Sequence, residues 1–331
     1  MAIVLNPITL PASKMLATMT SLIGDVRLEE NLRPSNLVND LVDGTRIGNV
    51  EYGKGIVFPF KVDVQPVKAL SKTSSAFTIT EPNVEEETIQ IDEYNFIPIS
   101  ISETLVKDSL LKGELIAKFM DYLMTLLEDT EQFYLYDVMN NLIQSWTPGQ
   151  ATQTITITLL DTTGMTGDTL TKTEQYNSNQ IAKTIRKTLN NMKIKNSKYT
   201  DIATYTSVND GNTYPVVSCL KDDDVQIVFN DKYMTNFIAD SMASLYHGEK
   251  VGEMIPNNKL ILLPEDSMTL ANQNTICWLS DKKKFAFADF YKAVFGILDP
   301  STLYQNTFLH FAYGCGIFSY APGVKFVANY I

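Results

Sequence analysis

The sequence contains few of the residues that build metal sites, disulfide frameworks or thiol catalysts. Its three cysteines, Cys219, Cys277 and Cys315, lie far apart without a CxxC spacing, and its histidines are His247 and His310. A structural zinc site needs four ligands of this kind, and a disulfide framework needs paired cysteines. We therefore predict no metal site and no bound cofactor. The low cysteine content is typical of a reducing compartment.

Long apolar runs are also missing. No stretch approaches the roughly 18 apolar residues that a membrane-spanning helix requires. The first residues, MAIVLNPITLPASK, lack the basic start and the apolar centre of a secretory signal peptide. We expect a protein that is made in the cytosol and has no membrane partner.

Basic residues are fewer than acidic residues. The chain has 27 Lys and Arg against 38 Asp and Glu, a formal net charge of -11. Proteins that bind duplex DNA neutralise phosphates with a basic patch, so this balance argues against that class. Two basic stretches remain, residues 183–198 and 282–284, and we interpret both as solvated faces.

No catalytic constellation is evident. His310 precedes Cys315 by five residues, which suggests a thiol and imidazole pair. An odd separation on a strand places the two side chains on opposite faces, unless Gly314 or Gly316 forms a bulge. We therefore predict no catalytic residue and no enzyme activity.

Three polar motifs have plainer interpretations. The acidic runs at residues 85–87 and 222–224 lack the spaced ligands and the glycine of a calcium loop, and we interpret them as solvated turns. Residues 53–55, Gly-Lys-Gly, lack the remainder of a phosphate-binding loop and fit the base of a hairpin better.

The chain does contain enough apolar residues for a full core. Of its 331 residues 44% are hydrophobic, and 16 Tyr and 16 Phe supply wide contact surfaces. Residues 50–65 and 87–102 alternate with a period of two, so we predict the two arms of a hairpin with a polar tip at 71–75. A projecting hairpin has little core of its own and needs partners.

A long helix is predicted over residues 114–145. This stretch has no Gly or Pro, and its apolar residues recur at spacings of three and four. At 1.5 Å per residue the helix is a rod of roughly 48 Å. We predict a short helix at 103–111 before it and a sharp end at Trp146 to Gly149.

The other segments alternate between short strands and helices. Before the hairpin we predict helices at 15–23 and 36–42. After the long helix we predict strands at 151–160, 200–208, 225–229, 259–263, 285–290, 307–320 and 324–330, and helices at 178–192 and 231–244. The pattern indicates an α+β protein with an inserted α/β lobe, in which the final strand completes the sheet begun near Ile155.

This order of parts resembles the major capsid proteins of tailed bacteriophages, the Hong Kong ninety-seven type of fold. The resemblance lies in residues 51–60 with 90–102 as the arms of an E-loop, 114–145 as a spine helix and 306–330 as closing strands. It implies four parts: an N-terminal arm at 1–49, an E-loop at 50–99, a peripheral domain at 100–167 and 300–331, and an axial domain at 168–299.

The resemblance implies a major head protein of the virion, assembled in the host cytoplasm. Its copies would form hexamers and pentamers and close an icosahedral shell around double-stranded DNA, without sequence-specific contacts. It also implies a portal and, since fewer than fifty residues precede the E-loop, a separate scaffolding protein.

Some members of that family join subunits through a Lys and an Asn. Four lysines lie in or near the E-loop, and we expect them to be unreactive: Lys54, Lys61, Lys68 and Lys72. Two alternatives remain open. One is an encapsulin, a shell of the same fold around a cargo enzyme, and the other is an α/β enzyme with a substrate site in residues 221–263.

Overall fold

The computed structural model describes residues 56–61, 84–89, 93–102, 114–206, 211, 213–236, 260–299 and 304–331. Several predictions lie outside these residues: the N-terminal arm, the helices at 15–23, 36–42 and 103–111, the hairpin tip, the Gly-Lys-Gly motif at 53–55, His247, and three of the four E-loop lysines, Lys54, Lys68 and Lys72.

The described helices and strands follow one another in the predicted order, with two unpredicted strands, at 213–215 and 275–281, and one predicted strand divided into two. Their bounds are β1 Ile56–Lys61, β2 Val84–Ile89, β3 Glu93–Ser102, α4 Glu114–Ser145, β4 Thr154–Leu159, α5 Gly167–Met192, β5 Thr204–Thr206, β6 Thr213–Pro215, β7 Val225–Asn230, α6 Asp231–Asn236, β8 Leu260–Leu263, β9 Thr275–Asp281, β10 Phe285–Asp299, β11 Tyr304–Ile317 and β12 Gly323–Tyr330. Four 3-10 turns lie at Ala151–Gln153, Asp222–Asp224, Glu265–Ser267 and Leu270–Asn272.

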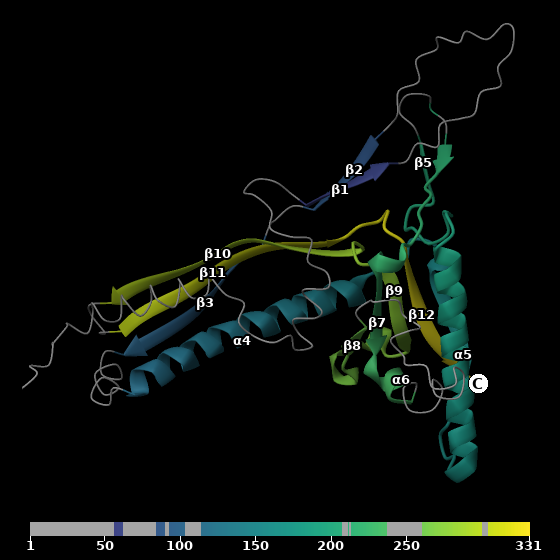
Figure 1. Ribbon diagram of the computed structural model, residues 1–331, viewed down its shortest axis with the longest axis horizontal. Helices are drawn as coiled ribbons and strands as arrows, with labels where there is room; N and C mark the ends of the chain where they lie inside the picture. The colour runs from purple at the N-terminus through teal and green to yellow at the C-terminus, as the bar shows by residue number, and fades with distance from the viewer. Residues whose placement is uncertain are drawn as a thin grey trace, which may run out of the picture.

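The helix α4 has the bounds that the sequence predicts. Its buried residues Leu127, Leu135, Met139 and Ile143 recur every four or eight positions and form one apolar stripe. The helix ends where Trp146 and Pro148 follow, because proline cannot continue the backbone hydrogen bonds of a helix. Figure 1 shows this rod running along the three-stranded sheet.

The three-stranded sheet has the order β10-β11-β3, and all its pairs are antiparallel. The strand β10 is much longer than the predicted strand at 285–290. A register shift between Asp289 and Tyr291 reverses the phase of its alternation, so the period-two pattern that begins at Phe285 breaks at this point.

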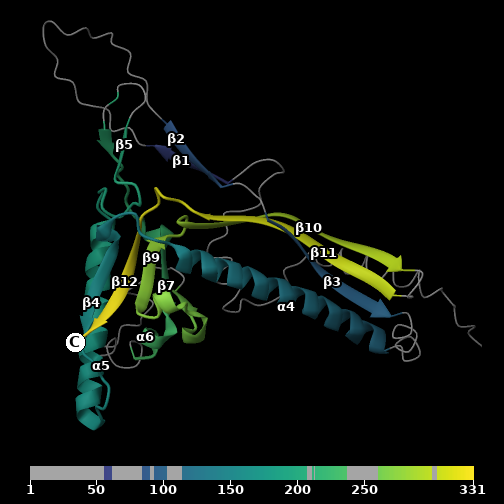
Figure 2. The same cartoon turned by 180° about the vertical axis from the view of Figure 1, so that it is seen from behind.

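The five-stranded sheet has the order β4-β12-β9-β7-β8. The helix α5 covers one face, where Ile181, Ile185 and Leu189 share a buried cluster with Phe229 and Phe326. The C-terminal half of α4 covers the other face (Figure 2). The prediction that the last strand completes the sheet begun near Ile155 is confirmed, since β12 pairs with β4.

Burial on both faces explains why one strand of this sheet was missed. Every residue of β9 is buried. A strand that is buried on both sides does not alternate between polar and apolar residues, so the period-two signal is lost. The helix α5 begins eleven residues earlier than the predicted helix at 178–192. The prediction missed this part of the helix because its residues are mostly threonine and other polar types, which have a weak helical preference.

The predicted return arm of the hairpin is two strands and not one. The strand β1 pairs with β2, from Ile56 opposite Ile89 to Lys61 opposite Val84. The strand β3 pairs with β11 instead, from Ser102 opposite Tyr304 to Glu93 opposite Tyr313. The prediction that residues 90–102 pair with 51–60 is therefore wrong. Ile97 of β3 packs against the buried cluster beside α4, and this burial is available only in the β11 sheet.

Candidate functional site

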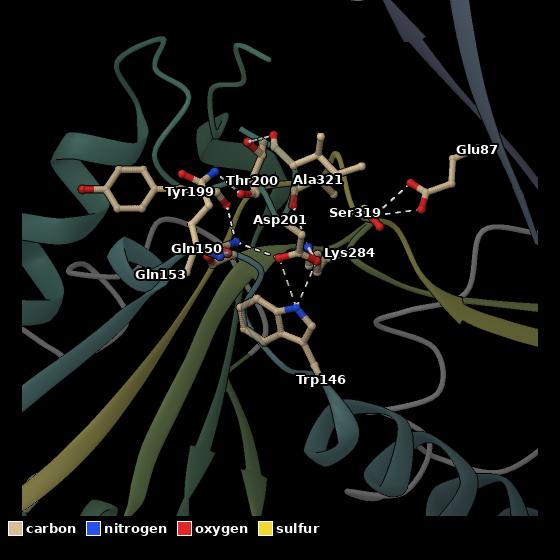
Figure 3. A network of polar contacts seen from close by, with 12 residues as sticks. Glu87, Trp146, Gln150, Gln153, Tyr199, Thr200, Asp201, Lys284, Ser319 and Ala321 are labelled. Carbon is tan, nitrogen blue, oxygen red and sulfur yellow. Dashed lines mark hydrogen bonds and ion pairs between the residues drawn. The ribbon is translucent and has the colours of Figure 1, made fainter. Parts of the chain in front are cut away.

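A buried polar junction lies where α4 ends and the two sheets meet (Figure 3). The Lys284 side chain is fully buried, and its Nζ lies 2.7 Å from Oδ2 of Asp201, whose side chain is 14% exposed. The same Nζ donates to the Ala321 carbonyl at 3.0 Å and lies 5.0 Å from the Trp146 ring centroid. Three separate chain segments therefore meet on one ammonium group.

Asp201 is held by neutral donors as well. Trp146 Nε1 donates to both of its carboxylate oxygens, at 3.3 and 3.2 Å, and Gln153 Nε2 donates to Oδ1 at 2.8 Å. Burial lowers the pKa of Lys284, and the carboxylate of Asp201 opposes this shift. The pair joins the end of α4 to the loop after α5 and to the turn between β9 and β10.

Gly149 allows the backbone after α4 to approach this loop. A Cβ at this position would overlap the Asp201 carbonyl, which is backbone and cannot rotate away. We expect Gly149→Ala to lower the free energy of unfolding by about 3 kcal/mol, as overpacking against a rigid group does. Chemical unfolding followed by far-UV circular dichroism measures this loss.

The matched control is Gly164→Ala. Gly164 has a φ of +78° and nothing within 4 Å of its Cβ position, so its substitution carries only a backbone cost. That cost is about 1–2 kcal/mol. A loss at Gly149 no larger than the loss at Gly164 would contradict the close approach.

The β1–β2 hairpin is tied to the junction through Glu87. Both of its carboxylate oxygens accept the N–H of Ser319, at 3.0 and 2.8 Å. The carbonyl of Ser319 accepts the N–H of Asp201 at 2.9 Å. The turn between β11 and β12 therefore holds the hairpin on one side and the Lys284–Asp201 pair on the other.

Two interpretations of charged runs need correction here. The run at 85–87 lies in the strand β2, and its member Glu87 is a half-buried acceptor, not a residue of a solvated turn. In the run at 282–284 the first two lysines are exposed, but Lys284 is buried. The sequence carries no signal for this burial, because Lys284 and its partner Asp201 are 83 residues apart.

The second feature is a surface of aromatic and apolar residues on the sheet β10-β11-β3, on the side away from α4. We call it the outer aromatic face, and its members are Tyr94, Phe96, Tyr291, Phe295, Ile297, Tyr304, Phe308 and His310. Tyr94 is 62% exposed, Phe96 56%, Phe295 50% and Ile297 64%. His310 lies at its centre, stacked on Phe96 with ring centroids 5.6 Å apart and edge-on to Phe295 at 5.3 Å.

The register shift in β10 creates this surface. Beyond the shift Tyr291, Phe295 and Ile297 point outward, and Lys292 points toward α4, where its Nζ lies 2.5 Å from the Glu131 carboxylate. Without the extra residue these apolar side chains would face the helix, because a shift of one residue exchanges the two faces of a strand.

His310 and Cys315 stay apart, as their odd spacing predicts. His310 belongs to the outer aromatic face, and Cys315 packs against the buried cluster beside α4. The bulge lies in β10 and not at Gly314 or Gly316. The other acidic run, at 222–224, forms a turn in which Asp224 bonds Lys282 at 2.6 Å.

Within the described ranges, no cluster of three or more His, Cys, Asp or Glu side chains could hold a metal ion. Of the helices that the structure describes, none combines the length and the apolar character needed to cross a membrane.

Known proteins resemble this chain in sequence and in fold. The sequence model of a family described as Phi29-like phage major capsid protein matches residues 58–327. No curated protein matches the sequence. These matches do not support the encapsulin or the enzyme alternative.

Solved phage structures share the fold over most of the chain. The capsid structure of Staphylococcus phage Andhra aligns with a TM-score of 0.56 at 7% identity, over 91% of this chain and 88% of that chain. A structure of the head fibre and inner core protein of bacteriophage P68 gives 0.58 at 8%, over 90% and 87%. The mature capsid of bacteriophage PhiM1 gives 0.53 at 8%, over 91% and 90%.

Proposed function

Because this chain belongs to the Phi29-like phage major capsid protein family and is a shell-forming component of the virion, we propose that its copies close an icosahedral shell of hexamers and pentamers around double-stranded DNA. The outer aromatic face carries the proposal. Large exposed apolar patches on soluble proteins mark interaction sites. In a chain that forms shells, the partner for this patch is another copy.

The energy of the contact comes from apolar area. Covering one exposed phenylalanine is worth about 1.5–3 kcal/mol. Each subunit of a closed shell makes several such contacts, so modest pairwise affinities add up to a stable particle. His310 adds a further ring to this contact surface, since it stacks on Phe96 and lies edge-on to Phe295.

The proposal also covers the packaged DNA and the other proteins of the particle. The net charge of -11 favours DNA that is confined without adhering, because like charges repel the phosphates. The proposal includes a separate scaffolding protein, a portal and assembly in the host cytoplasm. The role is structural and not catalytic.

We also propose the division into an N-terminal arm at 1–49, an E-loop at 50–99, a peripheral domain at 100–167 and 300–331, and an axial domain at 168–299. In this division the two domains share their sheets. The strand β12 of the peripheral domain pairs with both β4 and β9, and β10 of the axial domain pairs with β11.

The test is a pair of substitutions on the outer aromatic face. We expect Phe96→Asp together with Phe295→Asp to raise the protein concentration needed for shell assembly about a hundredfold or more, since two rings that the proposed contact covers are replaced by charges. A concentration series followed by electron microscopy and sedimentation, under conditions in which the wild-type chain forms shells, measures the change.

The control is Leu270→Asp. Leu270 is 87% exposed but lies in the turn before β9, away from the outer aromatic face. Leu270→Asp should change the free energy of unfolding by no more than about 0.5 kcal/mol. The Phe96 and Phe295 variant also loses two ring contacts with His310, so its free energy of unfolding should fall by about 1–3 kcal/mol. Normal shells from the Phe96 and Phe295 variant would refute the proposed contact.

A further inference from the structure

The outward side of α5 carries a line of cations between two exposed apolar residues. Tyr176, Lys183 and Lys187 are spaced by seven and four residues, which places them on one stripe of the helix, and Ile194 follows two residues after the end of α5. Tyr176 is 47% exposed and Ile194 67%. From Tyr176 to Lys187 the stripe is about 17 Å long at 1.5 Å per residue. We call it the α5 stripe.

The α5 stripe lies on the side of the helix that is turned away from the sheet. The opposite side, with Ile181, Ile185 and Leu189, packs on the five-stranded sheet. Both views of the molecule show α5 at its edge, with the sheet on one side only (Figures 1 and 2). The exposed side is therefore available to another molecule.

The charge around this stripe differs from that of the rest of the chain. Residues 172–198 contain seven of the 27 Lys and Arg and only one of the 38 Asp and Glu, Glu174. The remaining 304 residues therefore carry 20 basic and 37 acidic residues, so the rest of the chain is net acidic. A cationic face on an acidic molecule attracts a second molecule of the same kind.

We propose that the α5 stripe docks on an acidic surface of a neighbouring copy in the shell, with Tyr176 and Ile194 as its apolar anchors. Two α5 stripes cannot face each other, because their lysines repel. The contact is therefore heterologous, the kind that generates rings of subunits and not isolated two-fold dimers. Tyrosine is among the residues that are enriched at protein interfaces, so Tyr176 suits the role of an anchor.

This inference rests on the assembly of copies into a shell, and it is tested by reversing two charges. We expect Lys183→Glu with Lys187→Glu to raise the concentration needed for assembly about tenfold, since each exposed ion pair is worth up to about 1 kcal/mol and 1.4 kcal/mol is a factor of ten. The difference from the wild type should shrink in about 1 M salt, where charges are screened beyond about 3 Å.

The matched control is Lys232→Glu with Lys283→Glu. It changes the net charge by the same amount at two exposed lysines outside the α5 stripe, and the ion pair of Lys232 with Glu265 lies on the surface. We expect the control to assemble like the wild type. Equal defects in both variants would overturn the proposal, because net charge alone would explain them.

Two further results would overturn it. The first is normal assembly of the Lys183 and Lys187 variant. The second is normal assembly with a reduced DNA content, which would assign the α5 stripe to nucleic acid and not to another copy. The wild-type chain in the same assay tests the proposed function, which requires only that shells form. When wild-type shells do form, a difference between the wild type and the variant reports on the α5 stripe alone.

Discussion

Replacing Asp201 with alanine should lower the free energy of unfolding by about 3–5 kcal/mol, the usual cost of leaving one member of a buried ion pair alone. The substitution leaves the fully buried Lys284 ammonium with the Ala321 carbonyl as its remaining acceptor in the junction. It also removes the acceptor of the Trp146 indole N–H and one of the three acceptors of Gln153 Nε2. Chemical unfolding by circular dichroism, with the chain kept below the concentration for assembly, measures the loss.

The loss should depend on pH in a defined direction. Burial lowers the folded-state pKa of Lys284, and removing Asp201 lowers it further. The unfolded state then binds more protons than the folded state between the two pKa values, so stability rises with pH in that window. The Asp201→Ala variant should therefore recover part of its loss between pH 7 and about pH 10, below the ordinary lysine pKa.

Lys284→Met is the control for this argument. It removes the buried charge and keeps an unbranched apolar chain, and Asp201 still accepts from Trp146 and Gln153. Its cost should be about 1–2 kcal/mol, smaller than that of Asp201→Ala. In a variant that carries both Asp201→Ala and Lys284→Met, the loss of unfolding free energy should be smaller than the sum of the two single losses. If Lys284→Met lowered the free energy of unfolding more than Asp201→Ala does, the unpaired buried ammonium would not be the main cause of the loss in Asp201→Ala.

The second large effect is expected at Trp146. Its side chain is 3% exposed, and its ring packs edge-on to Phe285 with centroids 5.9 Å apart. It also lies against Gly323. Trp146→Ala should cost about 3–5 kcal/mol, because it leaves a cavity in the core that joins α4 to both sheets. Unfolding should be followed by circular dichroism, since the substitution removes an indole fluorophore.

Trp146→Phe separates packing from hydrogen bonding. The phenyl ring keeps most of the apolar contact but cannot donate to Asp201. Its cost should be about 1.5–3 kcal/mol, the value of a hydrogen bond to a charged group. A variant that is as stable as the wild type would mean that the indole N–H contributes nothing to the junction.

The sequence was sufficient for elements whose signals are local. The helix α4 was predicted with its bounds because helical periodicity, the absence of Gly and Pro, and the stop at Pro148 all lie within its own residues. The fold class followed from the order of such elements, and the resemblance to phage capsid proteins followed from the same order. The odd spacing of His310 and Cys315 was likewise enough to keep them apart.

Features that depend on distant partners could not be predicted in this way. The strand β3 has the alternation of a hairpin arm, but burying Ile97 beside α4 pairs it with β11. The outer aromatic face exists because one register shift in β10 reverses which side chains face the helix. Neither pattern reveals its partner strand, because a period of two is the same whichever strand lies alongside.

The amino-acid sequence by itself determined where the helices and most strands lie, because helical and strand periodicity are properties of neighbouring residues. Only the tertiary structure decided which strands pair, which aromatic side chains face outward and that Lys284 is buried on Asp201. These outcomes depend on contacts between residues that are far apart in the chain. Such contacts bury apolar area and pair charged groups only once the whole chain has folded.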